Sequence, residues 1–403
     1  MILKKIISTF VFLFAPAFAC AHVLLGADNL LLHYKELIEN KRVAVVTNQT
    51  GYTSEGVRTI DAIRTTPGVT LAAVFTPEHG LSGTVQAGKN ILSYFDTSLG
   101  VNVFSLYGPQ RKPTEAMLKG IDVIVYDIQD IGVRSYTFIS TLGLVMQAAA
   151  EHDIPVVVLD RPCPLATHVD GNVLDTTYRS FIGMYPVPYV YGMTVGEFAW
   201  MINDERMNGK PCKLMVVPMA GWKRAMAWKE TGLHWIPTSP NIPFASTAAY
   251  YAAFGTIGEL GIGAYEGIGT PEAFRVFALP GLDGAQFRKL FAEKRLDGVQ
   301  CEPYDTDIVH PRGAVHYEGA KFTLDIDRVK DITVVGLEVL SVLVEMHAIH
   351  PPDSAHAAMF AKTCGGDYLQ QILRGDPIRY ISGEWQTKRE QFLLRRDKYL
   401  LYQ

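Results

Sequence analysis

Glu78 and His79 are the first candidates for acid–base chemistry in this chain. They stand in the turn PEHG at residues 77–80, directly after an apolar run at residues 71–75. A glutamate that projects from such a turn into a cleft can act as a general acid, and His79 can serve as a hydrogen-bonding partner. In the alternative interpretation Glu78 caps the next helix or pairs with an arginine.

A second motif, DIQDIGVRSY, concentrates polar side chains at the end of another apolar run. Asp127, Gln129, Asp130, Arg134 and Tyr136 all fall within ten residues. Burying so many polar groups costs free energy unless they are paired. Arg134 could hold a substrate carboxylate with two parallel hydrogen bonds. Alternatively, Arg134 forms a salt bridge with Asp127 or Asp130 that shapes the loop.

Weaker candidates follow other apolar runs. Asp160 and Arg161 could contact a ligand or form a local ion pair. Asn241 lies in the proline-rich link IPTSPNIP, where it could reach a cleft between domains or bond its own backbone as a turn amide. Glu259 and Glu266 flank a glycine-rich stretch, whose glycines could admit a ligand close to the backbone or form simple bends.

The elements that must position these residues can be predicted from hydrophobic patterning. Continuous β-branched runs indicate strands buried on both faces, as in parallel sheets covered by helices. The predicted strands are residues 42–46, 71–75, 101–106, 122–126, 155–159 and 213–217, with helices at 137–151 and 194–204. Ligands of such sheets bind at the carboxyl ends of the strands. Here those ends carry Asn48, Glu78, Asp127, Asp130 and Asp160.

The chain is expected to divide into two domains, because 403 residues exceed the size of one ordinary core. The pattern changes at the proline-rich link, which disfavours helix. We predict a mostly parallel α/β domain over residues 22–245. A smaller α+β domain is predicted over residues 246–403, ending in an amphipathic helix at about 385–399.

The first 21 residues have the order of a secretory signal peptide. Two lysines precede an apolar run at residues 6–18, and small residues follow at Ala19 and Ala21. We expect cleavage after Ala21, a periplasmic or secreted protein, and no stable membrane span in the mature chain. A lipoprotein anchor at Cys20 and an uncleaved anchor are the alternatives. The four remaining cysteines are scattered, and we expect mostly buried thiols.

Composition and missing motifs exclude several classes of function. A net charge of −4 without a basic cluster argues against nucleic-acid binding. No G-x-x-x-x-G-K-[ST] or G-x-G-x-x-G motif follows the first strand, and neither G-x-S-x-G nor H-E-x-x-H occurs. We therefore expect no nucleotide cofactor and no metal.

Six motifs, in this order, resemble those of the NamZ-like exo-β-N-acetylmuramidases: VTNQTG, FTPEHGL, YDIQDIGVRSYTF, LDRPCP, YGMTVGE and SPNIP. The resemblance extends from about residue 42 to the closing RRDKYLLY. It implies a Rossmann-like N-terminal domain, a smaller C-terminal domain and a cleft between them. It also implies removal of β-linked N-acetylmuramic acid from the non-reducing end of peptidoglycan fragments, an activity of cell-wall recycling.

The resemblance also implies roles for individual residues. Glu78 matches the family's PEHG glutamate and would donate a proton to the leaving oxygen. Glycosidases commonly use two carboxyl groups that flank the scissile bond, and the second would be Glu259, Glu266 or Asp127. Arg134 would bind the lactyl carboxylate of muramic acid. The implied substrate-binding set is Asn48, His79, Gln129, Asp130, Arg134, Tyr136, Asp160, Arg161 and Asn241.

One segment departs from the family pattern. Relatives usually carry EGTN followed by GRGT after the proline link, whereas this chain has ELGIGAYEGIGTP, with Ile268 where arginine is expected. A non-catalytic peptidoglycan- or sugar-binding envelope protein on the same fold is therefore the main alternative. An esterase or amidase is a third, for which the sequence offers no evident nucleophile or metal site.

Overall fold

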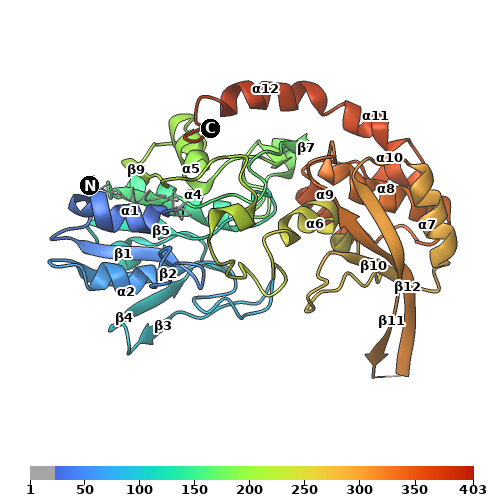
Figure 1. Cartoon of the computed structure of the whole chain (residues 1–403). Coiled ribbons are helices and arrows are strands. Elements are labelled where there is room, and N and C mark those ends of the chain that lie inside the picture. Colours follow the sequence, from blue (N-terminus) through green and yellow to red (C-terminus); the bar gives the residue numbers. More distant parts are fainter. Residues whose placement is uncertain (1–22, 312) are drawn as a thin grey trace, which may run out of the picture.

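The computed structural model describes residues 23–311 and 313–403. A large domain and a smaller one lie side by side, and the C-terminal helices cross from the smaller domain back to the larger one (Figure 1). The predicted signal peptide, including Cys20, lies outside the described residues.

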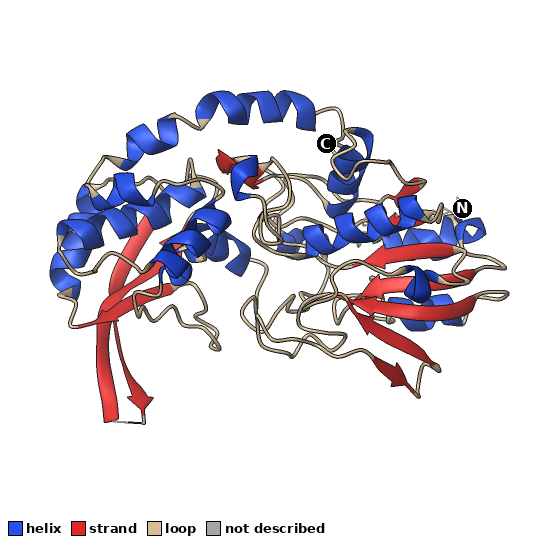
Figure 2. Ribbon diagram, turned by 180° about the vertical axis from the view of Figure 1, so that it is seen from behind, coloured by secondary structure: helices blue, strands red, loops and turns tan. Residues whose placement is uncertain are grey.

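The large domain is built on a seven-stranded sheet of order β3-β4-β2-β1-β5-β6-β9, in which β3 alone is antiparallel to its neighbour (Figure 2). Its strands are β1 (Arg42–Thr47), β2 (Thr70–Thr76), β3 (Tyr94–Asp96), β4 (Val101–Ser105), β5 (Val123–Asp127), β6 (Val156–Leu159) and β9 (Leu214–Val217). The structure confirms the predicted mostly parallel α/β architecture and all six predicted strands. The short edge strand β3 was not predicted.

Helices cover both faces of this sheet, because successive strand residues point to opposite sides. Ala44 and Val46 of β1 pack in one cluster with α4 (Phe138–Glu151) and α5 (Val195–Asp204). Val43 and Val45 pack in the other cluster, with residues of α1 and α2. The remaining elements of this domain are α1 (Gly26–His33), η1 (Lys35–Leu37), α2 (Thr59–Arg64), α3 (Glu115–Leu118), β7 (Asp170–Val173), η2 (Thr176–Tyr178), β8 (Pro188–Val190) and η3 (Trp228–Thr231).

The smaller domain combines a three-stranded antiparallel sheet, of order β10-β12-β11, with helices. The two longest strands form a hairpin that projects from the body of the domain (Figure 1). Its elements are α6 (Thr247–Phe254), η4 (Ile257–Leu260), β10 (Val276–Pro280), α7 (Gly284–Glu293), β11 (Val299–His310), β12 (Gly313–Leu324), α8 (Ile332–Glu345), α9 (Ser354–Cys364), α10 (Leu369–Leu373), α11 (Ile378–Gly383) and α12 (Gln386–Arg396). Helix α12 corresponds to the amphipathic helix predicted from the sequence.

Two general expectations can be compared with the described residues. The four cysteines there are free thiols, and Cys163, Cys212 and Cys364 are buried, as expected. Within residues 23–311 and 313–403, no helix combines the length and apolar character needed to cross a bilayer.

The last residues of the chain pack against the large domain. The Tyr402 hydroxyl donates to Asp160 Oδ2 at 2.6 Å and accepts from the Met219 backbone N–H at 2.9 Å. The Leu401 backbone N–H donates to Glu197 Oε1 at 2.8 Å. The tail thus completes the hydrogen bonding of two buried carboxyl groups at the N-terminal end of α5.

We expect Tyr402→Phe to lower the free energy of unfolding by about 1–3 kcal/mol, because the buried Met219 N–H loses its acceptor and Asp160 loses a donor. Urea denaturation measures the change, and the m-value should stay constant. Tyr380→Phe is the matched control: Tyr380 is 63% exposed, and its loss should change stability by under about 0.5 kcal/mol. Equal effects of the two variants would contradict a stabilising role for the tail.

Candidate active site

A cleft of about 510 Å³ opens where the two domains meet. We call it the interdomain cleft. Its wall on the large domain includes Glu78, His79, Tyr107, Ser135, Tyr136 and Thr137, followed along the chain by Ser239 and Asn241 of the proline-rich link. Its wall on the smaller domain includes Tyr251, Glu259, Glu266, Phe274, Met359 and Thr363. Three glutamates from the two domains therefore share one cavity.

Glu78 reaches the cleft from the turn that follows β2. His79 and Gly80 both adopt left-handed backbone, with φ of 71° and 78°, which lets the chain reverse sharply after the strand. Glu78 Oε2 accepts from Thr137 Oγ1 at 2.8 Å, and Oε1 accepts from the Gly88 backbone N–H at 3.0 Å. Both carboxylate oxygens are thus held in place.

Thr137 and His79 support this arrangement. Thr137 is the N-cap residue of α4, yet its hydroxyl does not cap the helix and binds Glu78 instead. His79 Nδ1 lies 2.6 Å from the Val85 carbonyl oxygen. Because a carbonyl can only accept, Nδ1 must carry the hydrogen. The ring closes the loop that brings Gly88 to Glu78.

Glu266 is the most buried carboxyl group of the cleft, with 9% of its surface exposed. Burial raises its pKa to about 8, and the negative charge of Glu259 adds to the increase. Oε1 is buried and has no hydrogen-bond partner among the described residues. Oε2 lies against Gly258, where an added Cβ would come within 2.6 Å. Glu266 is therefore protonated at neutral pH.

Glu259 lies closer to solvent than Glu266. It is half-buried in η4, and burial raises its pKa, while the charge of His356 opposes the shift. The glutamates also affect two of the three phenols that line the same cavity. Burial, with the charge of Glu78, raises the pKa of Tyr107. Burial, with the charges of Glu259 and Glu78, raises the pKa of Tyr251. Both glutamates thus lie within electrostatic range of the Tyr251 hydroxyl.

Only part of the motif DIQDIGVRSY reaches the interdomain cleft. Tyr136 lines the cleft and donates to Thr238 Oγ1 at 2.7 Å, and Ser135 lies beside it. Asp127, by contrast, is fully buried and paired with Arg161 through both oxygens, at 2.6 and 2.9 Å. The structure does not bring Asp127 to the cleft, so the suggestion that it is the second catalytic carboxylate is not supported.

The position of Arg134 contradicts a second expectation, that it binds the substrate carboxylate or pairs with an aspartate of its own loop. Arg134 is fully buried among neutral groups, and it forms neither the predicted salt bridge nor a side of the cleft. Its Nη1 donates to the carbonyls of Asn172 and Val187, at 2.7 and 2.8 Å, and its Nη2 donates to the Cys364 carbonyl at 2.5 Å. Burial lowers its pKa to about 10, so the guanidinium remains charged at neutral pH. It links loops of the large domain to the end of α9.

The other predicted ligand-binding residues are divided between the cleft and the interior. Asn241 lines the cleft, and its Oδ1 accepts from the Gly269 N–H at 3.2 Å. Asn48 is buried, with its Oδ1 bonded to Thr50. Asp130 accepts from Tyr191 and from the Gly132 N–H, and burial raises its pKa to about 6. These two residues lie outside the interdomain cleft, contrary to expectation.

Asp160 and Gln129 also have internal partners. Asp160 is fully buried and accepts from Thr194 Oγ1, the Gly196 N–H and Tyr402, which makes it an anchor for the start of α5. Gln129 Nε2 donates to the Pro162 carbonyl at 2.6 Å. Gln129 and Arg161 line a different cavity, described below. Neither lines the interdomain cleft with Glu78, and their predicted role in substrate binding stays a prediction.

Sequence reasoning missed several residues of the cleft. Thr137 and Ser135 adjoin residues already singled out, and a search for donors beside Glu78 would have found Thr137. Tyr107 follows a predicted strand but carried no motif. Tyr251 lies in α6, which is apolar all round and gives no periodic signal. Its place at the cleft depends on how the domains pack.

Comparison with known proteins identifies the family. Residues 43–246 match the model of the N-terminal domain of the exo-β-N-acetylmuramidase NamZ, and residues 249–402 match that of its C-terminal domain. The chain belongs to the NamZ family.

Similar proteins support membership of the NamZ family over nearly the whole chain. It is 34% identical over 383 residues to the peptidoglycan β-N-acetylmuramidase NamZ of Bacillus subtilis, covering 94% of this chain and 91% of that protein. A crystal structure of a DUF1343 family protein from Bacteroides fragilis superposes with a TM-score of 0.88 at 36% identity, covering 95% of this chain and 99% of that one. A second one from the same organism gives 0.70 at 28% identity, with the same coverage.

The departure from the NamZ-family pattern lies mostly outside the cleft. Ile268, which stands where arginine is expected, is 46% exposed and is not among the residues that line the cavity. Glu259 and Glu266, from the same altered segment, both line it. The carboxyl groups of the NamZ-family chain are therefore kept at the cleft despite the altered spacing.

The internal role of Arg134 gives a stability prediction for this NamZ-family chain. We expect Arg134→Met to lower the free energy of unfolding by about 3 kcal/mol, because three buried carbonyls lose a charged hydrogen-bond donor. Chemical denaturation measures it. The control is Arg374→Met, whose exposed partner Asp376 should contribute under about 0.5 kcal/mol. An Arg134→Met variant with unchanged stability and lost ligand binding would show that Arg134 acts on the ligand instead.

Proposed function

We propose that this protein is an exo-β-N-acetylmuramidase that removes β-linked N-acetylmuramic acid from the non-reducing end of peptidoglycan fragments. The proposal rests first on one observation: glutamates from both domains face a single cleft of about 510 Å³. Membership of the NamZ family supports the choice of sugar and the exo mode of action. The substrate and the N-terminal signal pattern support a location outside the cytoplasm, in the periplasm or secreted.

Glycoside hydrolysis needs one carboxyl group that donates a proton and a second that acts as a carboxylate. We assign the proton donor to Glu266, because it is the group that holds a proton at neutral pH. Its side chain lines the cleft with 9% of the residue's surface exposed, so a bound sugar could reach it. This assignment differs from the sequence-based one, which gave the role to Glu78.

We assign the role of the anionic carboxylate to Glu78. Its two oxygens accept hydrogen bonds from Thr137 and Gly88, an arrangement that suits a fixed anion. Glu78 and Glu266 belong to different domains, so the sugar would be held between them. Glu259 provides the charge that helps to keep Glu266 protonated. Tyr107 and Tyr251 provide neutral hydroxyls for hydrogen bonds to the sugar.

The purified mature protein should cleave a chromogenic β-N-acetylmuraminide but not the corresponding N-acetylglucosaminide. Glu78→Gln should lower kcat by about 10²- to 10⁴-fold while sugar binding is largely kept. The control is Glu39→Gln, at an exposed position away from the cleft. Saturable sugar binding without cleavage of either substrate by the wild type would favour the non-catalytic alternative.

The proposed roles also predict the pH dependence. A general acid must be protonated, so kcat/KM should fall on the alkaline side, tenfold per pH unit above about pH 8. Glu266→Gln should retain activity on a nitrophenyl muraminide, whose leaving group needs little protonation, and lack this alkaline limb. The same variant should lose activity on an unactivated disaccharide.

Glu338→Gln is the matched control, because Glu338 is another half-buried carboxyl group with a raised pKa and lies in α8, outside the cleft. This control should behave as the wild type. An alkaline limb that persists in Glu266→Gln would assign the proton donor to another residue.

A further inference from the structure

The large domain contains a second cavity, of about 310 Å³, that the proposed reaction does not use. We call it the switch-point pocket. It lies beyond the carboxyl ends of β1, β5 and β6, with Thr50, Tyr52, Gln129 and Arg161 among its lining residues. In the strand order, β1 and β5 are neighbours from which the chain proceeds in opposite directions. Open α/β sheets bind ligands at such a topological switch point.

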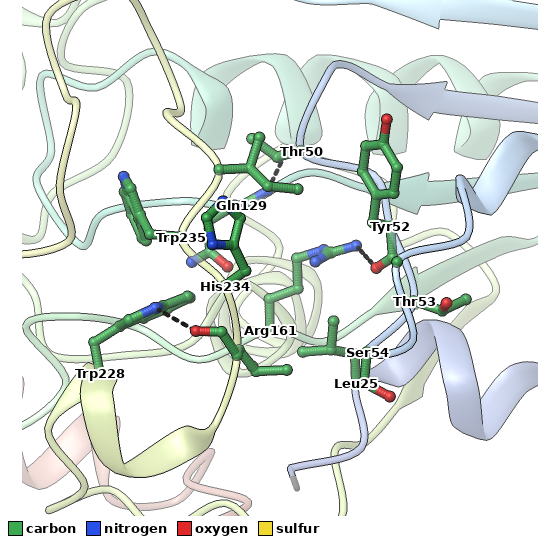
Figure 3. Close-up of a pocket in the computed structure, with 13 residues that line it drawn as sticks. Leu25, Thr50, Tyr52, Thr53, Ser54, Gln129, Arg161, Trp228, His234 and Trp235 are labelled. Carbon is green, nitrogen blue, oxygen red and sulfur yellow. Dashed lines mark hydrogen bonds between the residues drawn. The ribbon is translucent and has the colours of Figure 1, made fainter.

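The pocket has aromatic walls. Trp228 and Trp235 meet edge to face, with ring centroids 4.7 Å apart, and His234 stands beside them. The loop from Thr50 to Ser54 lies on the opposite side, with Arg161 between the two (Figure 3). Trp228 is held by a hydrogen bond from its Nε1 to the Leu233 carbonyl, at 3.2 Å. Trp235 is held in the same way, by a hydrogen bond from its Nε1 to the Ile242 carbonyl at 3.1 Å.

The polar groups of the pocket include one free donor and one free acceptor. Arg161 uses Nε and Nη2 on Asp127 and Tyr52, and its Nη1 has no hydrogen-bond partner among the described residues. Gln129 uses its Nε2 on two carbonyls, and its Oε1 has no partner in the same set. Asp127 neutralises the charge of Arg161. The pocket therefore suits a neutral ligand with hydroxyl groups more than an anion such as phosphate.

A sugar ring has this chemistry, with an apolar face that packs on aromatic rings and an edge of hydroxyl groups. The pocket also lies close to the interdomain cleft. Ile236 lines the pocket and Ser239 lines the cleft, so their Cα atoms are at most about 11 Å apart. Between them, the Pro237 and Thr238 carbonyls accept from Gln49 Nε2, at 2.7 and 3.0 Å. These bonds hold the segment that leads from the pocket to the cleft.

We propose that the switch-point pocket binds the N-acetylhexosamine on the leaving side of the fragment whose terminal sugar occupies the interdomain cleft. The inference rests on the proposed function, because it takes the two cavities to be filled by one substrate. It assigns Trp228 a role in binding the leaving sugar and none in bond cleavage.

The test compares two substrates. One is the β-linked disaccharide of N-acetylmuramic acid and N-acetylglucosamine, and the other is β-N-acetylmuramyl fluoride, whose leaving group is too small to fill the pocket. Trp228→Ala should raise KM for the disaccharide by about tenfold, as expected for a lost ring contact, with kinetics on the fluoride unchanged. Trp228→Phe should restore most of the disaccharide KM. Trp200→Ala, at a 44%-exposed tryptophan on α5, is the control and should change neither substrate.

Equal losses on both substrates, or no change on the disaccharide, would overturn the proposal. The melting temperatures of the Trp228 variants and of His234→Ala, at the exposed rim of the pocket, are compared with that of the wild type. An unchanged melting temperature shows that a variant has lost a contact and not its fold. Titration of the Glu78→Gln protein with N-acetylglucosamine, followed by tryptophan fluorescence, gives a readout independent of turnover. If the wild type cleaves neither substrate, the proposed function fails. A saturable fluorescence change that Trp228→Ala abolishes would still establish a sugar site in the pocket.

Discussion

The arrangement of the two domains depends on a buried cation without a carboxylate partner among the described residues. Arg134 is surrounded by carbonyl oxygens that lie 38, 53 and 230 residues away in the chain. The guanidinium donates to all three carbonyls, of which that of Val187 also accepts from the Leu174 backbone N–H at 3.1 Å, so the guanidinium and the loops stabilise one another. Gly365 ends α9 in left-handed backbone, and an added Cβ there would come within 2.4 Å of the guanidinium. The position of α9, and with it one wall of the cleft, follows from this contact.

The two cavities differ in the electrostatics that their neighbours impose. In the interdomain cleft, carboxyl groups face one another, and burial together with the charge of Glu259 raises the pKa of Glu266 to about 8. In the switch-point pocket, opposite charges are paired, and Arg161 with Asp127 presents little net charge. One sheet edge thus carries a region suited to proton transfer and another suited to the recognition of neutral groups. The difference arises because Asp127 is paired with Arg161, whereas the glutamates of the cleft face one another.

Much of the large domain could be predicted from the sequence, because continuous β-branched runs such as residues 42–46 and 122–126 are a strong local signal. The location of Glu78 at a strand end followed from the same reasoning. The roles of Arg134 and Asp127 did not, because a polar cluster after a strand looks the same whether its partners are ligands or distant loops. Tyr251 and Glu266 reach the cleft only through packing between domains, and no local pattern encodes that packing.

The contact between Tyr402 and Asp160 has a consequence for how the chain acquires its structure. Asp160 directly follows strand β6, yet one of its donors, Tyr402, lies 242 residues further along the chain. The other donors to Asp160, the Arg161 and Gly196 backbone N–H groups and the Thr194 hydroxyl, all belong to the large domain, so only Tyr402 makes this buried carboxyl group depend on a distant segment. The large domain therefore reaches its full hydrogen bonding only when a segment that follows the smaller domain in the sequence has docked on it.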